Sequence, residues 1–385
     1  MRLLKIIYRN TLRHWLRTSL TVLGLAIAVV AFIVIRTTID AWYAQSEAAS
    51  PDRLITRHAV SLTFFLPLAY ENRIQDVEGV KAVSHATWFG GVYVEPKNFF
   101  ANFAIDHTKY LDLYPEFVLE PAERDAFMQE RNAAIVGRNL ADRFGWQVGD
   151  RITLTGTIFP GDWELVIRGI YTGAKENTDE STMMFRWDYI DERLRREVPA
   201  RAGYVGTFVV QVDDPQEAAV VSEKIDALFQ NSLAETKTET EEAFNLSFVA
   251  MAGSIVLGLK AISILVIGIF MLVLGNTMAM TARERVSEYA VMKTLGFRPL
   301  HIVGLIFGES LFIAALGGAL GIALSFPLGG LVKTMLSNFF PVYTIAFWTV
   351  VFAGLIAFVV GLLAAVFPTV KAVRTSIVDG LRIID

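Results

Sequence analysis

The sequence predicts a membrane protein with four transmembrane α-helices and a large α+β extracytoplasmic domain inserted between helices 1 and 2. Hydrophobic residues make up 53% of the 385 residues and charged residues only 19%, with a mean hydropathy of +0.44. In a typical soluble protein, about a quarter of the residues are charged. The apolar excess is concentrated in long uncharged runs, and the charged residues gather mainly between residues 37 and 245.

Four uncharged runs are long enough to cross a bilayer. A hydrocarbon core of about 30 Å needs about 20 helical residues, and the runs hold 18, 22, 23 and 37 residues. Pro341 and Tyr343 divide the longest run, which indicates an extracellular-side loop followed by a span at 347–367. The runs cover residues 18–35, 261–282, 310–332 and 334–370.

A cleaved signal peptide is the alternative interpretation of the first run. Its apolar stretch is longer than the hydrophobic region of a signal peptide, which has about 7–15 residues. No small-x-small cleavage site precedes the polar residues 40–45. We therefore expect an uncleaved anchor, and a mature chain that started near residue 45 would contradict this.

The distribution of charge predicts the orientation. Segments 1–17, 283–298 and 371–385 together hold twelve basic and four acidic residues, whereas 37–245 holds 20 basic and 34 acidic ones. Loops rich in Lys and Arg stay on the cytoplasmic side. We expect cytoplasmic N- and C-termini in a bacterial inner membrane, with the lipid bilayer as a partner. The acidic domain disfavours nucleic-acid binding.

Helix-favouring residues continue the two spans that border the acidic domain. Residues 37–49 prolong helix 1, and 239–260 lead into helix 2. Two unbroken helices would form a stiff stalk, which transmits tilt better than a flexible linker does. Residues 1–15 predict a basic amphipathic helix, which lies in the headgroup layer or docks on a partner, or else only anchors the first span.

Between the stalks, strands bounded by Gly, Pro and Asp alternate with helices, which is typical of an α+β domain. Strands are expected at 80–88, 133–136, 151–155, 164–171 and 206–212. Helices are expected at 67–77, 137–144 and 215–229. The complete division is 1–15 amphipathic helix, 16–45 helix 1 and stalk, 46–238 extracytoplasmic domain, 239–282 stalk and helix 2, 283–298 cytoplasmic helix, 299–332 helix 3, 347–370 helix 4 and 371–385 cytoplasmic tail.

The segment 283–298 is a short charged helix between two spans. It carries four basic and two acidic residues, and Gly296 followed by Pro299 predicts its end. Glu284 and Glu288 lie four residues apart, a spacing at which like charges on one helix face repel. Either Arg285 offsets Glu288 within the helix, or these carboxylates meet basic groups of a cytoplasmic partner. The length and cap of the segment favour the partner.

This segment resembles a known signature. The run Arg285-x-x-Glu-Tyr-Ala-Val-Met-Lys-Thr-Leu-Gly-Phe297 looks like the coupling helix of FtsX-like/MacB-type ABC transporter permeases. Glu309 and the Gly-rich run 317–321 follow in the family's order, and residues 134–154 resemble its MacB-like periplasmic core domain. The resemblance covers nearly the whole chain. The residues to which it assigns ATPase coupling are Arg283, Glu284, Arg285, Glu288, Tyr289, Met292, Lys293, Gly296 and Phe297.

The resemblance implies a permease subunit that is driven from the cytoplasm. Its partners would be an ABC ATP-binding subunit, a second permease subunit (identical or a related paralogue) and a periplasmic adaptor protein. ATP hydrolysis would then do mechanical work in the periplasm, called mechanotransmission, on a peptide, lipoprotein or hydrophobic substrate. The chain has no G-x-x-x-x-G-K-[ST] loop. We therefore expect no cofactor in this chain, with ATP and Mg on a separate ATPase.

Two other functions remain open at this point. The same machine can act as a transmembrane regulator of a periplasmic enzyme, as the FtsX-like branch implies. Alternatively, the outer domain is a membrane-anchored sensor or enzyme. Against an enzyme, the pairs Asp106/His107 and Asp179/Glu180 lack a nucleophile, base and orienting group. The chain has no cysteine and five scattered histidines, so neither catalytic nor metal residues are expected.

Three residues inside helix 3 stand out. Glu309 is an ionisable group in a span, which costs about 2.5–3.5 kcal/mol or more unless it is partnered. Lys260 is the only basic candidate within the spans, but it belongs to the opposite end of helix 2, so Glu309 is expected to satisfy a neighbouring helix or the charged segment near the cytoplasmic interface. Gly317 and Gly321 form a G-x-x-x-G pattern, which serves dimerisation or packing within one subunit equally well.

Overall fold

The computed structural model describes residues 15–175, 177–336, 340 and 342–378, so the helix expected at 1–15 lies outside them except for Trp15. The chain divides into two compact units. The first contains Met1–Ala41, Ala252–Leu336 and Tyr343–Asp385, and the second contains Trp42–Met251 and Ser337–Val342.

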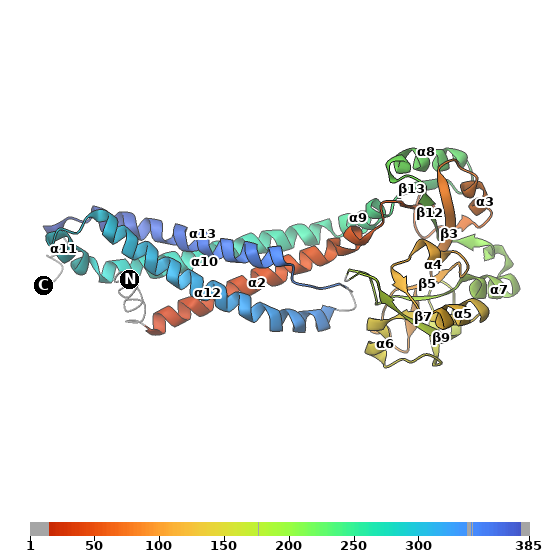
Figure 1. Cartoon of the computed structure of the whole chain (residues 1–385), viewed down its shortest axis with the longest axis horizontal. Helices are drawn as coiled ribbons and strands as arrows, with labels where there is room; N and C mark the ends of the chain where they lie inside the picture. The colour runs from red at the N-terminus through yellow and green to blue at the C-terminus, as the bar shows by residue number, and fades with distance from the viewer. Residues whose placement is uncertain (1–14, 176, 337–339, 341, 379–385) are drawn as a thin grey trace. The chain divides into compact units, whose positions relative to one another are not determined.

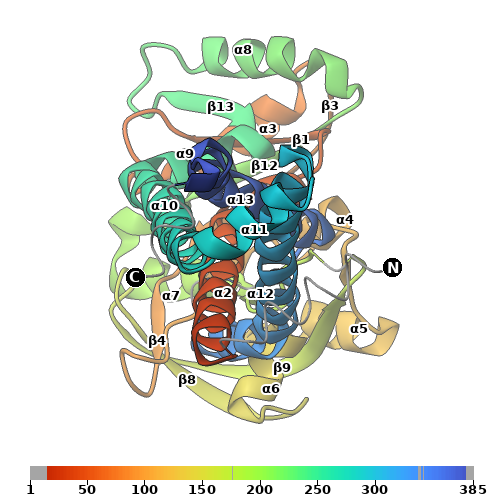
Figure 2. The ribbon, with the colours of Figure 1, turned by 90° about the vertical axis from the view of Figure 1, so that its left-hand side faces the viewer.

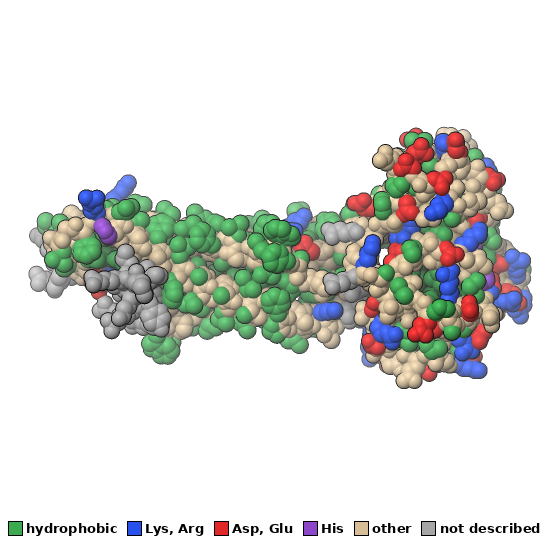
Figure 3. Space-filling model, in the orientation of Figure 1, with side chains coloured by type: hydrophobic (Ala, Val, Ile, Leu, Met, Phe, Trp, Pro, Cys, Tyr) green, Lys and Arg blue, Asp and Glu red, His purple; other side chains and the backbone are tan. Residues whose placement is uncertain are grey.

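The first unit is a bundle of long helices (Figure 1). Four of its helices are long and apolar enough to cross a membrane among the described residues. Figure 3 shows hydrophobic side chains covering the visible surface of this unit; Leu272, for example, is 70% exposed. Water would penalise such a surface, whereas lipid accommodates it. The helices are α2 (Trp15–Ala48), α10 (Gly253–Glu284), α11 (Val286–Thr294), α12 (Pro299–Leu336) and α13 (Phe347–Arg374).

Helix bounds differ from the expected ones at several ends. α12 and α13 both continue past residues 332 and 370. α2 runs unbroken to Ala48, as predicted for the first stalk. The prediction of an unbroken second stalk is wrong. Residues 239 and 240 end a strand, and the helix is interrupted at Ala252, where φ is −89° and ψ is 8°. Gly253 follows at once, and glycine weakens a helix because it has the most backbone freedom to lose.

The second unit is built on one mixed sheet. Its strand order is β13-β1-β12-β3-β5-β10-β7-β9-β8-β4, with β6 paired to β9, and a separate ladder joins β11 to β2. Pairs β5–β10 and β7–β9 are parallel, and the other pairs are antiparallel. The strands are β1 (Arg53–His58), β2 (Leu66–Pro67), β3 (Val80–Trp88), β4 (Gly91–Tyr93), β5 (Asn102–Ile105), β6 (Phe117–Val118), β7 (Ala133–Gly137), β8 (Arg151–Gly156), β9 (Gly161–Gly173), β10 (Met183–Arg186), β11 (Tyr204–Val205), β12 (Thr207–Val212) and β13 (Thr236–Thr240).

Helices cover both faces of the central strands. Along β1, Leu54 belongs to one buried cluster and Ile55 to the other, because successive side chains of a strand point to opposite faces. The first cluster includes Ile190 of α7 and Ile225 of α8, and the second includes Phe127 of α5. The helices of this unit are α3 (Tyr70–Gln75), α4 (Tyr110–Leu113), α5 (Pro121–Gln129), α6 (Arg138–Phe144), α7 (Trp187–Glu197), η1 (Pro199–Arg201), η2 (Pro215–Glu217), α8 (Ala218–Leu228) and α9 (Glu241–Met251).

The fold confirms the predicted class. The α/β unit is inserted between the first long helix and the other three. β3 has the expected bounds, and β7 runs directly into α6 as predicted. The helix expected from residue 67 is wrong at its start. Pro67 pairs with Tyr204 in a short ladder, and helix α3 begins only at Tyr70. Proline has no backbone N–H, and it is tolerated at an edge position where the ladder does not need that donor.

Candidate functional site

The charged segment forms one end of the helix bundle. Figure 2, turned so that this end faces the viewer, shows α11 between the ends of α10 and α12. The expectation of a single helix over 283–298 is wrong in its bounds. Arg283 and Glu284 end α10, Arg285 breaks the helix with φ −105° and ψ 11°, and α11 is restricted to Val286–Thr294. Glu284 and Glu288 therefore do not share one continuous helix face.

A buried ion pair attaches α11 to the bundle. Nη1 of Arg285 donates to Oε2 of Glu309 in α12 at 3.0 Å, and the two side chains are only 6% and 8% exposed. Glu309 thus contacts the charged segment, one of the two kinds of partner expected for it, through Arg285. Tyr289 is buried beside this pair, and burial, with the charges of Glu309 and Glu288, raises the pKa of Tyr289 to about 12. Its phenol is thus neutral at physiological pH.

The other end of α11 is attached to α13. Nζ of Lys293 donates to the carbonyl oxygens of Ala372, Val373 and Thr375 at 3.2, 3.0 and 2.7 Å. The last carbonyls of a helix have no intrahelical donor, so a lysine there both caps the helix and complements its dipole.

Gly296 ends α11 as predicted. Its φ is +86°, a value that only glycine adopts without strain. Its N–H reaches the Lys293 carbonyl at 3.1 Å, while the N–H of Phe297 reaches the Met292 carbonyl at 3.0 Å. These two bonds define a Schellman motif. The chain thus turns sharply from α11 into α12, which begins at Pro299.

The remaining side chains of the segment divide into two faces. Tyr289 is buried in the cluster formed with α10, α12 and α13, and Met292 packs against that cluster. Ala290 is buried as well. Glu288 and Val291 are exposed on the other side. Beyond the helix, Leu295 and Phe297 are 72% and 45% exposed. We call Glu288, Val291, Leu295 and Phe297 the outer face of α11.

A further ion pair at this end was not predicted. Nη1 and Nη2 of Arg17, near the start of α2, donate to the two carboxylate oxygens of Glu284 at 2.8 Å each. The pair joins the first and second long helices, as does the contact of 3.4 Å between the hydroxyls of Thr21 and Thr277. The sequence signal is the basic N-terminal segment, which predicts the orientation and an amphipathic helix but does not indicate Glu284 as the partner of Arg17.

The glycines of α12 pack within this chain. A Cβ on Gly317 would lie 2.8 Å from Cβ of Leu25, and one on Gly321 would lie 2.7 Å from the carbonyl oxygen of Ala26. Real Cβ atoms do not approach other atoms this closely, so α2 and α12 touch where the glycines stand. The sequence leaves dimerisation and packing within one subunit open for these glycines. The contacts with α2 are those of packing within one subunit.

One group of possible metal ligands occurs among the described residues, namely Glu71, His85 and Asp106. Oε2 of Glu71 lies 2.9 Å from Nδ1 of His85, and Oε1 accepts from Lys109 at 2.7 Å. Asp106 accepts from the backbone and hydroxyl of Thr108, and Nε2 of His85 is buried without a partner. Because the lysine already neutralises the Glu71 carboxylate, we interpret the group as an internal polar network.

The network makes a prediction about acid. Burial opposes ionisation of Glu71, but the bonds to His85 and Lys109 outweigh it, so its pKa lies below the ordinary 4.5. Its stabilising contribution is complete above the unfolded pKa and is lost as pH falls through the folded one. Glu71→Gln should flatten the decline of Tm below about pH 4.5 in full-length protein, whereas Glu78→Gln, whose side chain is 91% exposed, should leave it unchanged. Equal declines for wild type and Glu71→Gln would contradict this.

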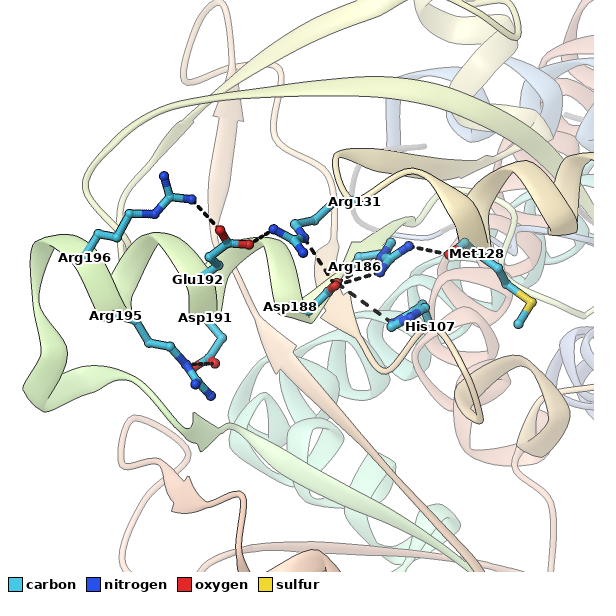
Figure 4. Close-up of polar contacts among 9 residues, drawn as sticks. All are labelled: His107, Met128, Arg131, Arg186, Asp188, Asp191, Glu192, Arg195 and Arg196. Atoms are coloured by element: carbon cyan, nitrogen blue, oxygen red, sulfur yellow. Dashed lines mark hydrogen bonds and ion pairs between the residues drawn. The ribbon is translucent and has the colours of Figure 1, made fainter.

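A cavity of about 500 Å³ lies beside α7, in the part of the α/β unit that the structure describes. Arg131 and Glu192 are among the residues that line it. Figure 4 shows Arg131 between Glu192 and Asp188, while Arg196 reaches Glu192 from the next turn. Positive and negative groups pair with each other here, so the surface has no single charge to select a ligand.

The two pairs considered above as catalytic candidates, Asp106/His107 and Asp179/Glu180, also have partners within the α/β unit. His107 lies 3.9 Å from Asp188. Asp179 accepts from Ser181 and Thr182, and Glu180 accepts from the N–H of Gly173. These contacts hold the loops that carry the two pairs against α7 and β9.

Comparison with known proteins matches these two units to two families. The FtsX-like permease C-terminal family matches residues 260–377, which include α11 and its attachments. The MacB-like periplasmic core domain family matches residues 18–228, more than half of the chain. The chain belongs to the FtsX-like/MacB-type ABC transporter permeases. With its four apolar helices it is a multi-pass membrane protein, and an ABC permease implies a partner ATP-binding subunit.

The relatives of this permease differ in length. An uncharacterised ABC transporter permease of Methanocaldococcus jannaschii is 24% identical over 80% of this chain and 77% of its own. The macrolide export ATP-binding/permease protein MacB 2 of Yersinia pestis is 25% identical over 46% of this chain but only 26% of its own. The periplasmic region of MacB from Actinobacillus actinomycetemcomitans aligns with a TM-score of 0.38 and 10% identity, over 52% of this chain and 94% of its own.

Proposed function

We propose that this permease receives the stroke of an ATP-binding subunit on the outer face of α11 and passes it to its extracytoplasmic domain. One observation carries the proposal. α11 is fixed to α12 by Arg285–Glu309 and to α13 by Lys293, while its outer face remains accessible. A helix held at both ends moves with the spans that hold it, so force applied to its outer face reaches the bundle.

The polarity of this scheme follows from charge. Because the three base-rich pieces stay inside, we propose that both termini and α11 face the cytoplasm of a bacterial inner membrane. The α/β unit then works in the periplasm. In this scheme ATP and Mg are carried by an ATPase on another polypeptide.

The remaining partners are proposals of the same scheme. A second permease subunit, identical or related, completes the transporter, and the periplasmic unit engages an adaptor or the cargo itself. The cargo class is a peptide, a lipoprotein or a hydrophobic molecule, moved by efflux or extraction. The work is mechanical, and the permease itself catalyses no reaction.

Charge reversal on the outer face tests the coupling. Glu288→Lys should reduce the permease-stimulated part of ATP hydrolysis about tenfold, which corresponds to about 1.4 kcal/mol, because a like charge then faces the basic groups of the ATPase. Because Glu288 is exposed, the variant should remain folded. The measurement is ATPase activity of the complex in nanodiscs.

Glu223→Lys is the matched control, since it makes the same charge change on an exposed position of helix α8. It should keep full stimulation. Purification in mild detergent with mass spectrometry first identifies the ATP-binding subunit. If no such subunit co-elutes, or if Glu288→Lys retains full stimulation, the proposed docking on α11 is wrong.

A further inference from the structure

One arginine of the α/β unit is buried among groups from distant parts of the chain. Arg53, the first residue of β1, is only 4% exposed. Its Nε donates to Glu241 at 2.8 Å, and its Nη1 donates to the Leu113 carbonyl at 2.9 Å. Nη1 and Nη2 also reach the two oxygens of Glu116 at 3.1 and 2.6 Å.

The guanidinium also lies over an aromatic ring. Its carbon is 4.2 Å from the centre of the Tyr114 ring, a cation–π contact that strengthens when water is excluded. Burial opposes the charge of Arg53, but Glu116 and Glu241 outweigh it and raise its pKa. The group is therefore a fixed cation that satisfies two carboxylates, and arginine suits this role because its donors form a planar fork.

Glu241 links this arginine to both connections with the membrane bundle. It is the first residue of α9, the helix that leads back toward α10. The same oxygen that accepts from Arg53 also accepts from the backbone N–H of Ser50 at 3.0 Å. Ser50 lies directly after the turn that ends α2. One carboxylate oxygen thus holds the exit from α2 and the start of α9 together.

The two connections need such a link because they differ in stiffness. α2 passes without a break from Trp15 to Ala48, whereas the return path is interrupted at Ala252. The β1–β13 ladder already pairs Leu54 with Thr240, but it ends there. Beyond the ladder, only side-chain contacts can keep the two segments in register.

We propose that Arg53, Glu116 and Glu241 form a junction that makes the α2 and α9 connections enter the α/β unit as one body. Arg53 is a positioning residue in this proposal, which rests on the proposed function. Through Leu113, Tyr114 and Glu116 the junction also reaches the segment that follows α4. Movement of the connections is thereby delivered to the sheet and to the helices that cover it.

The same two strands supply a matched control. Arg57 donates to Glu239 at 3.0 Å, and Lys237 shares that carboxylate at 2.9 Å. Arg57 and Glu239 are both 14% exposed, and this pair joins β1 to β13 as Arg53–Glu241 joins β1 to α9. Glu239, however, lies within the β1–β13 ladder, opposite Ile55. Glu241→Gln and Glu239→Gln each remove one charge with little change in volume, but only the first weakens the junction.

The test follows movement of the domain in the complete complex. The chain contains no cysteine, so Ala219→Cys on α8 and Met335→Cys on α12 accept spin labels without background. Distances between the labels are measured by pulsed electron resonance in nanodiscs with the ATP-binding subunit, without nucleotide and with trapped ATP. Wild type and Glu239→Gln should show the same nucleotide-dependent shift. Glu241→Gln should lose the shift while it still binds the ATPase and hydrolyses ATP.

Each outcome identifies what has failed. A shift of wild-type size in Glu241→Gln overturns the junction and leaves the proposed function intact. No shift in wild type overturns the proposed function, and the junction with it. If Glu241→Gln does not fold, Glu116→Gln replaces it, since that change keeps the contacts of Arg53 and Ser50 with Glu241. It should reduce the shift, and an undiminished shift there would equally refute the junction.

Discussion

Replacing Glu309 by leucine is expected to leave most of the permease unfolded or unassembled. The change removes the carboxylate that faces the buried Arg285 guanidinium, at a site where both side chains are less than a tenth exposed. Removing one partner of a buried pair costs about 3–5 kcal/mol, a large part of the about 5–15 kcal/mol by which a domain is stable. Arg285→Met should be comparably harmful, because it strands the carboxylate of Glu309 instead.

The double variant separates charge from packing. Arg285→Met with Glu309→Leu removes both charges and fills the same space, a replacement that is often neutral for stability. We expect the yield of monodisperse protein on size-exclusion chromatography to fall for each single variant and to recover for the double one. Single variants that match wild type would show that this pair does not hold α11 in place. Lys260→Met, a change in α10 on an exposed side chain, is the control for loss of a cation.

The second large effect is expected at a glycine. Gly321→Ala places a methyl group 2.7 Å from the Ala26 carbonyl and 2.7 Å from Cβ of Val29, so α2 and α12 have to separate. Such overpacking costs about 1–3 kcal/mol. On the same helix, Gly330 has open space at its Cβ position, and Gly330→Ala should be neutral or slightly stabilising because alanine favours helix.

Thermal unfolding of the two alanine variants in one detergent compares the positions directly. Gly321→Ala should lower Tm and Gly330→Ala should not. If Gly321→Ala were as stable as wild type but changed the oligomeric state, dimerisation would be the role of this glycine after all.

The sequence predicts the elements whose pattern is local. The four spans follow from runs without charge, and β3 and the β7–α6 unit follow from apolar runs bounded by Gly and Asp. The end of α11 follows from Gly296, because a left-handed residue there stops the helix. The interruption at Ala252 did not follow, since alanine is the best helix former and Gly253 is a weak signal: α10 continues through Gly258, Gly268 and Gly275.

The contacts of the site were less predictable because their partners are far apart in the chain. Glu309 requires a partner, and membrane depth excludes Lys260 and leaves a neighbouring helix or the charged segment 283–298, without singling out Arg285. The sequence could have indicated Arg285, since it is the basic residue next to the same membrane face. Arg53 and Glu241 are 188 residues apart, and no spacing rule joins an arginine at a strand start to a glutamate at a helix start.

The contact of Lys293 with α13 has a practical consequence for work on this permease. Its amine is bound by three carbonyl groups at a helix end, so acylating reagents should modify it slowly while α11 is docked and faster when α11 separates from α13. The rate of its modification, read by mass spectrometry of one tryptic peptide, therefore reports how often the two helices part during the ATPase cycle. The native Lys293 therefore reports the separation of α11 from α13 without an introduced label.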